Sequence, residues 1–283
     1  MTIEPQLKKN GMPQGDDAKV TPEMKSFLVL LSDLHVGADR DVVVNEANTA
    51  DVLQAVVAQV LTGPKPDQVL VNGDVAYEKG LAGDYAHVAQ LLSPWVAARL
   101  PVAMTLGNHD DRVHFKAAGQ NGMGLFDPMD VGMAENDLVA SRHLGRVSVG
   151  GVDWYLLDSL RETDETPGEL GEAQRAWLAK ELDARPEQPA FVMAHHQPEN
   201  PNDTDDDGFG LADSVALMAL LEPRRQVKAV FHGHQHIYGV RTTSELHVVG
   251  LPATGFMFEK GNPLGYCEVR VEAGVLEVTR RRV

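Results

Sequence analysis

Five short apolar segments of this sequence each end in a cluster of Asp, Asn or His residues. The segments have the length and uniform apolarity of buried strands. The clusters that follow them are Ser32-Asp33-Leu34-His35, Asn72-Gly73-Asp74, Gly107-Asn108-His109-Asp110, His195-His196 and His232-Gly233-His234-Gln235-His236. In open α/β sheets, ligands bind beyond the carboxyl ends of the strands. The pattern therefore predicts that five distant segments converge on one site at one edge of a sheet.

Helices are expected between these strands. Apolar residues recur at three- and four-residue spacing in 48–61, 84–100 and 172–182, which is typical of amphipathic helices. The predicted strands are 27–31, 68–71, 102–106, 146–149, 154–157, 190–193 and 227–231. This alternation of buried strands and helices indicates a layered α/β fold. The sequence predicts no regular secondary structure for residues 111–146, and it predicts short strands separated by turns for 237–278.

The chain is expected to form a flexible N-terminal arm, residues 1–24, followed by a single domain, residues 25–283. The arm is polar and rich in Gly, Pro and Asp, and no later linker divides the sequence. No apolar run reaches the roughly 18 to 20 residues of a membrane span. Residues 1–21 lack the apolar core of a secretion signal. These features predict a cytoplasmic protein without membrane contact, although a signal removed from a longer precursor is compatible with them. The oligomeric state is left open, and a dimer is one option.

Charge and cysteine content exclude several classes of function. Lys and Arg number 25 against 41 Asp and Glu, which leaves a formal net charge of −16. This balance argues against a general nucleic-acid binder, which normally presents a basic face. Cys267 is the only cysteine, so neither an intramolecular disulfide nor a cysteine-based zinc cluster can form.

The residue types at the strand ends suit a pair of divalent or trivalent metal ions. Imidazole accepts zinc, iron or manganese, and the oxygens of Asp and Asn complete such a shell. Residues two apart in an extended chain point the same way. Asp33 with His35, and His234 with His236, have this spacing. Each pair is therefore expected to direct both side chains into one site.

The motifs together resemble those of the calcineurin-like metallophosphoesterase superfamily. The resemblance rests on Asp33-x-His35, Gly73-Asp74, Gly107-Asn108-His109-Asp110, His195 and Gly233-His234-x-His236, and it spans most of the chain. Three further stretches are similar to the class III cyclic-nucleotide phosphodiesterase branch: 108–112 with the His195-His196 pair, 170–178 and 251–256. The resemblance implies a four-layer α/β/β/α sandwich, in which two mixed sheets are flanked by helices.

The resemblance also implies a role for each motif residue. Asp33, His35 and His236 would hold one metal ion. Asn108, His195 and His234 would hold the other, and Asp74 would bridge the two. His196 would lie outside the ligand shell. The sequence does not distinguish iron, manganese and zinc, since availability often decides among metals with such ligands.

The expected function is that of a metal-dependent phosphoric ester hydrolase. The resemblance points to a phosphodiesterase that cleaves cyclic nucleotides or other small phosphodiesters through a hydroxide bound by both metals. His109 is expected to protonate the leaving oxygen, and Asp110 to orient it or nearby groups. Arg112 is expected either to contact a phosphate or a nucleotide edge of the substrate or to form a surface salt bridge. Phe256, in the 251–256 loop, is expected to hold the ester arm of the substrate.

Other functions are weighed against this prediction. A phosphomonoesterase or nucleotidase would use the same centre, and a non-catalytic scaffold would share the fold, although all seven ligand positions and His109 are filled. Protein phosphatases of the superfamily carry Gly-Asp-x-Val-Asp-Arg-Gly, whereas here Gly73-Asp74 continues as Val-Ala-Tyr-Glu.

The acidic stretch 203–207 imitates the start of a calcium loop. Its twelfth position is Ser214 where an acidic residue is required, so a solvated loop is expected.

Overall fold

The computed structural model of the chain describes residues 2–3, 25–119, 125, 129–130, 141–198, 208–243, 246–272 and 275–283. Most of the expected arm, most of 120–140 and the acidic stretch 203–207 lie outside the described residues. Within the arm, Thr2–Ile3 pair antiparallel with the strand Val275–Arg282. The division into an arm and a single domain stays a prediction.

Two six-stranded sheets form the centre of the molecule. The first has the order β1 (Thr2–Ile3), β14 (Val275–Arg282), β13 (Gly265–Glu272), β2 (Lys25–Ser32), β5 (Gln68–Asn72) and β6 (Val102–Thr105). The second has the order β11 (Gly239–Thr243), β12 (Leu246–Gly250), β10 (Val227–His232), β9 (Ala190–Met193), β8 (Val152–Leu156) and β7 (Gly145–Val149). Both sheets are mixed: β2, β5 and β6 run parallel in one, and β8, β9, β10 and β12 in the other.

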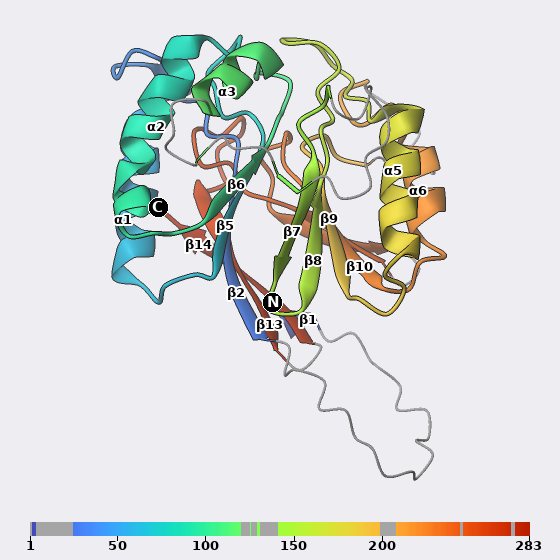
Figure 1. Cartoon of the computed structure of the whole chain (residues 1–283). Helices are drawn as coiled ribbons and strands as arrows, with labels where there is room; N and C mark the ends of the chain where they lie inside the picture. The colour runs from blue at the N-terminus through green and yellow to red at the C-terminus, as the bar shows by residue number, and fades with distance from the viewer. Residues whose placement is uncertain are drawn as a thin grey trace.

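Helices cover the outer face of each sheet (Figure 1). The first sheet carries α1 (Thr49–Thr62), α2 (Ala82–Ala97) and α3 (Arg112–Gly119) on one side of the molecule, and the second carries α5 (Gly171–Asp183) and α6 (Ser214–Leu221) on the other. Three clusters of buried side chains fill the spaces between the four layers. The predicted α/β/β/α sandwich is therefore confirmed.

Strand β2 shows why the residues form these layers. Its side chains alternate between two apolar environments, as the two-residue period of a strand requires. Phe27, Val29 and Leu31 pack among the helices of the first sheet, whereas Leu28 and Leu30 pack against the second sheet. A strand that is covered on both faces must be apolar throughout. The same reasoning accounts for the uniform apolarity of the other central strands.

Helices α3 and α6 were not predicted. The sequence of α6, Ser-Val-Ala-Leu-Met-Ala-Leu-Leu, is apolar on almost every side, so it has no amphipathic period to detect. Helix α2 also differs, because it begins at Ala82 and ends at Ala97, with Pro94 inside its last turn. Trp95 and Trp177 are buried in the cores, as expected.

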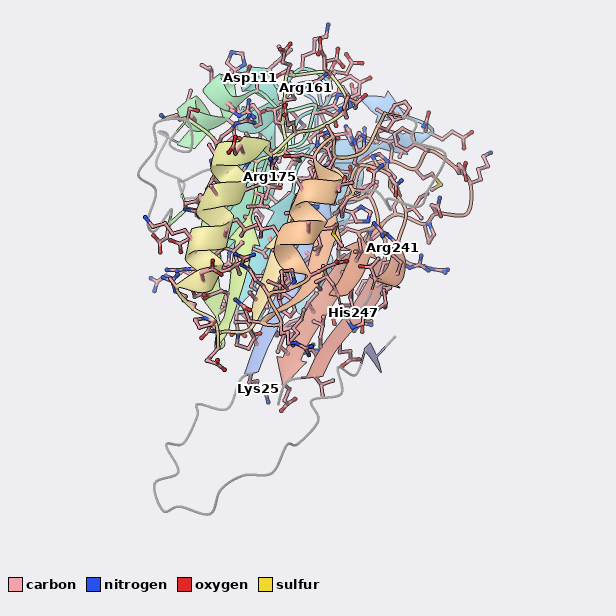
Figure 2. All side chains as sticks on the ribbon, turned by 90° about the vertical axis from the view of Figure 1, so that its right-hand side faces the viewer. Lys25, Asp111, Arg161, Arg175, Arg241 and His247 are labelled. Atoms are coloured by element: carbon pink, nitrogen blue, oxygen red, sulfur yellow. The ribbon has the colours of Figure 1, made fainter. Side chains whose placement is uncertain are left out.

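One carboxylate ties the two helices of the second sheet together. Figure 2 looks onto α5 and α6, with Arg175 labelled on α5. Asp213, just before α6, accepts hydrogen bonds from the backbone N–H groups of Leu170 and Gly171 at 3.1 and 3.0 Å and pairs with the Arg175 guanidinium. The carboxylate thereby binds the first N–H groups of α5.

Among the described helices, none combines the length and apolarity that a membrane crossing requires.

Candidate metal centre

The five motif segments meet in space, at the carboxyl ends of β2, β5, β6, β9 and β10. Sequence reasoning expected one edge of one sheet, whereas the residues come from both sheets. Two side-chain contacts cross between the sheets: Asp33 Oδ1 lies 3.3 Å from His236 Nε2, and Asp74 Oδ2 lies 3.1 Å from His195 Nε2. The convergence is as predicted, but the packing of two sheets produces it.

The backbone at these residues is not extended. Asp33, His35, Asp74, His234 and His236 have φ angles of 55°, 47°, 47°, 68° and 57°, in the left-handed region that non-glycine residues seldom occupy. The expectation that each i, i+2 pair lies in extended chain is therefore wrong. Such conformations cost free energy and persist where surrounding structure enforces them, most often at functional sites.

Two glycines let the backbone pass close to these side chains. Gly73 has a φ of 71°, and a Cβ atom there would lie 2.6 Å from Nδ1 of His195. A Cβ atom at Gly107 would lie 2.2 Å from Oδ1 of Asp74. Any larger residue at either position would displace one of the site residues.

Backbone carbonyls orient three of the imidazole rings. Nδ1 of His35, His195 and His236 lies 3.2, 2.8 and 2.8 Å from the carbonyl oxygens of Tyr77, Asn72 and Phe256. A carbonyl only accepts, so each Nδ1 carries the proton and donates it. In the neutral ring, the lone pair then resides on Nε2, which faces the centre. Metal-binding histidines are commonly held in this way.

The donor atoms form overlapping groups. Three sets each gather within 4.8 Å: Asp33, His35 and His236; Asp74, His195 and His234; and His35, Asp74 and His109. Asp74 belongs to two of them, and its Oδ2 lies 3.5 Å from His35 Nε2 as well as close to His195. Asp74 is thus the carboxylate placed between the two halves of the centre.

Burial and mutual charge set the protonation of these groups. Burial lowers the pKa of His35 and of His234 to about 4 each. Burial alone would raise the pKa values of Asp33 and Asp74, but neighbouring imidazoles hold both below their usual range. Burial likewise opposes protonation of His195, yet Asp74 and Asp33 raise its pKa to about 9. At neutral pH the centre therefore combines ionised carboxylates with neutral imidazoles at His35 and His234 and a protonated imidazole at His195.

Buried atoms that lack partners indicate that this donor set suits cations. Oδ2 of Asp33 and Oδ1 of Asn108 are buried, and neither has a hydrogen-bond partner among the described residues. Leaving such oxygens unpaired is costly, whereas a bound cation would satisfy both. Zinc, iron and manganese all accept such nitrogen and oxygen donors.

His109 and Asp110 occupy different environments. His109 is about a quarter exposed, and its Nδ1 lies 2.9 Å from the carbonyl oxygen of Glu78 and 3.9 Å from Oδ1 of Asp164. Asp110 is fully buried. Its carboxylate accepts hydrogen bonds from the N–H groups of Val75, Ala76 and Gly107 and from the hydroxyl of Tyr85. Asp110 therefore connects the loops that follow β5 and β6 and reaches no open space.

The two residues expected near the substrate, Arg112 and Phe256, both make contacts within the protein. The guanidinium of Arg112 donates to both oxygens of Asp158, at 2.7 and 2.8 Å, so a salt bridge is observed, but its carboxylate is buried and does not lie at the surface. Phe256 is 7% exposed, and its ring packs against His35 and His236 at 4.8 and 4.6 Å between centroids. Phe256 thus supports the rings of the centre.

Sequence reasoning missed Phe258 and Gln197. Both line a pocket of about 360 Å³ together with Asn108, His109 and His234. Phe258 follows the motif loop by two residues, and Gln197 follows the His195-His196 pair directly. Their closeness in sequence to the motif residues is the signal that could have identified them. His196 itself is buried, with Nδ1 2.8 Å from the hydroxyl of Ser159, outside the three donor groups.

Comparisons with known proteins agree with this geometry. The model of the calcineurin-like phosphoesterase family matches residues 28–238. The chain is 30% identical to the 3',5'-cyclic adenosine monophosphate phosphodiesterase CpdA of Pseudomonas aeruginosa over 237 residues, which cover 83% of this chain and 79% of that protein. It is 28% identical to the glycerophosphodiester phosphodiesterase GpdQ of Enterobacter lignolyticus over 67% of this chain and 63% of that protein.

The fold also recurs among solved structures. A dimetal phosphatase from Danio rerio superposes with a TM-score of 0.69 at 14% sequence identity, and the match covers 92% of this chain and 96% of that one. At this level of identity the likeness concerns the fold alone.

Proposed function

This chain belongs to the calcineurin-like phosphoesterase family and is a hydrolase, and we propose that it is a metal-dependent phosphodiesterase that cleaves cyclic nucleotides or other small phosphodiesters. The observation that carries the proposal is the arrangement around Asp74, whose carboxylate lies between two groups of donor atoms. The relatives named as phosphodiesterases support the diester assignment. The cytoplasmic location expected from the sequence stays a prediction.

We assign the ligands as the sequence motifs suggest. Asp33, His35 and His236 would hold one ion. Asn108, His195 and His234 would hold the other, with Asp74 shared. Bound metals would activate water as a nucleophile near neutral pH and stabilise negative charge on the phosphoryl oxygens.

The role of His109 in this reaction is proton delivery. Because its Nδ1 faces the carbonyl of Glu78, Nε2 is the atom left to act on the substrate. Oδ1 of Asp164 lies 3.9 Å from the same Nδ1. His109 lines the pocket, so its Nε2–H would reach the leaving oxygen of a bound ester. An alkoxide leaving group requires such a proton.

A comparison of cyclic AMP with AMP tests the proposal. We expect the protein, loaded in turn with manganese, iron or zinc at fixed pH, to show a higher kcat/KM for cyclic AMP. A monoester dianion carries more charge than a diester, so simple attraction to the metals favours AMP. Selectivity for the diester must come from His109 and the pocket. Faster hydrolysis of AMP would instead identify a phosphomonoesterase or nucleotidase.

A further inference from the structure

The pocket beside the centre has an unusual concentration of exposed apolar side chains. Phe209, Ile237 and Phe258 line it and are 54%, 43% and 60% exposed. Large apolar side chains scattered singly over a surface need no explanation, but a group of them around one hollow marks a binding site. These three surround the space next to His109 and His234, where a substrate phosphate would sit.

Phe258 presents an aromatic face to this space. Its ring stacks on the imidazole of His236, with centroids 4.1 Å apart and an interplanar angle of 23°. His236 therefore covers one face of the ring, and the residue is still 60% exposed.

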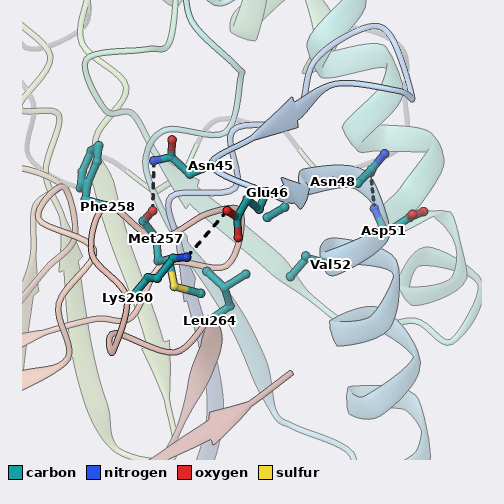
Figure 3. A pocket seen from close by; sticks show the side chains of 10 residues that line it. Asn45, Glu46, Asn48, Asp51, Val52, Met257, Phe258, Lys260 and Leu264 are labelled. Atoms are coloured by element: carbon teal, nitrogen blue, oxygen red, sulfur yellow. Dashed lines mark hydrogen bonds and ion pairs between the residues drawn. The ribbon is translucent and has the colours of Figure 1, made fainter.

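The loop that carries Phe258 also contacts the segment that contains Asn45 and Glu46. Figure 3 shows a second pocket, where Asn45 donates to the carbonyl of Met257 at 3.1 Å and Lys260 pairs with Glu46 at 3.8 Å. Phe258 lies at the edge of this second pocket and also lines the first. The Asn45 hydrogen bond connects the backbone next to Phe258 to the turn between β3 (Val43–Val44) and β4 (Ala47–Asn48).

Gln197 adds a polar edge to the same pocket. Its side chain lines the pocket, the residue is 7% exposed, and its Oε1 is buried without a hydrogen-bond partner among the described residues. A buried amide oxygen left unpaired is unfavourable, so a ligand group that donates a hydrogen bond would stabilise the pocket. A carboxamide also offers donors beside its acceptor.

We infer that this pocket binds the nucleobase of the substrate, with Phe258 and Ile237 covering the ring and Gln197 bonding its edge. A flat ring with apolar faces and a polar edge matches both features. An amide pairs with the adjacent donor and acceptor of adenine, and base stacking on an aromatic side chain is a strong contact. A glycerol or ethanolamine arm has no flat face for Phe258. The inference rests on the proposed diesterase function and selects the cyclic-nucleotide class within it.

The test uses the metal-loaded protein and three probes: cyclic AMP, glycerophosphoethanolamine and adenosine. Phe258→Ala and Gln197→Leu should each lower kcat/KM for cyclic AMP about tenfold and leave glycerophosphoethanolamine within about twofold. Phe258→Tyr, which keeps the ring, should retain the wild-type ratio. Val215→Ala is the matched control, because Val215 is 64% exposed on α6 and lines neither pocket.

Adenosine separates this inference from the proposed function, because it has no phosphate to cleave. Calorimetry should show that wild-type protein binds adenosine and that Phe258→Ala and Gln197→Leu weaken the binding about tenfold. Absence of adenosine binding, or equal losses on both diesters, would overturn the inference even if the diesters are hydrolysed. If neither diester is hydrolysed but adenosine binds as described, the proposed function fails and the nucleobase pocket stands.

Discussion

Nε2 of His35 lies 3.3 Å from Nε2 of His236, although 201 residues separate the two in the chain. Both rings donate Nδ1–H to backbone carbonyls, so in their neutral forms two lone pairs face each other. Two such nitrogens bound to one zinc ion at about 2.0–2.1 Å in tetrahedral geometry would be about 3.4 Å apart. The separation therefore suits a shared cation, which would remove the repulsion between the lone pairs.

Replacing Asp74 should affect both ions. Its carboxylate approaches His35 on one side and His195 on the other. We expect wild-type protein to retain about two ions per chain after dialysis against metal-free buffer, and Asp74→Ala to retain one or none, as measured by elemental analysis. Asp51→Asn, an exposed carboxylate on α1, is the control. Two firmly bound ions in Asp74→Ala would contradict the shared position of this residue.

Replacing His109 should impair chemistry and spare metal binding. We expect His109→Ala to keep both ions and to lose about 10²- to 10⁴-fold in turnover on alkyl diesters. With nitrophenyl esters the loss should shrink, because nitrophenolate leaves without protonation. Measured kcat values over a series of leaving groups decide the point. A loss of the same size for every leaving group would indicate that His109 positions the phosphate instead.

Asp110 should matter for stability more than for proton transfer. Asp110→Ala would leave three buried N–H groups without their acceptor, and we expect it to lower the free energy of unfolding by about 3 kcal/mol or more. Thr163→Val removes a single hydrogen bond to the backbone carbonyl of Asp110 and should cost about 1 kcal/mol. Urea titration of the metal-loaded proteins measures both. If Asp110→Ala were inactive but as stable as the wild-type protein, Asp110 would instead act in catalysis.

The Arg112 ion pair should contribute to stability as well. Asp158 is fully buried, so Arg112→Gln would leave its carboxylate without its charged partner. We expect a loss of about 3–5 kcal/mol with little change in KM for cyclic AMP. The exposed pair of Arg40 and Asp51, at 50% and 62% side-chain exposure, is the comparison, and Arg40→Gln should cost about 1 kcal/mol or less. A large rise in KM with unchanged stability would show that Arg112 contacts the substrate.

The sequence by itself determined the layered fold and the residues that gather at the centre. Both follow from local sequence. A strand that is covered on both faces must be apolar throughout, and Asp, Asn and His residues at the ends of several such strands indicate a binding site. Helix α6 shows the limit of this reasoning, because an almost wholly apolar helix has no period that distinguishes it from a strand.

Only the tertiary structure decided how those residues act. The left-handed backbone at Asp33 and His35, the carbonyl that orients each imidazole, and the pairing of Arg112 with Asp158 all depend on segments far apart in the chain. Phe256 and Phe258 differ by two positions, yet one is buried against the histidines and the other lines the pocket. Tertiary packing determines these outcomes, because the contacts of a side chain depend on the segments that surround it in the folded protein and not on its neighbours in sequence.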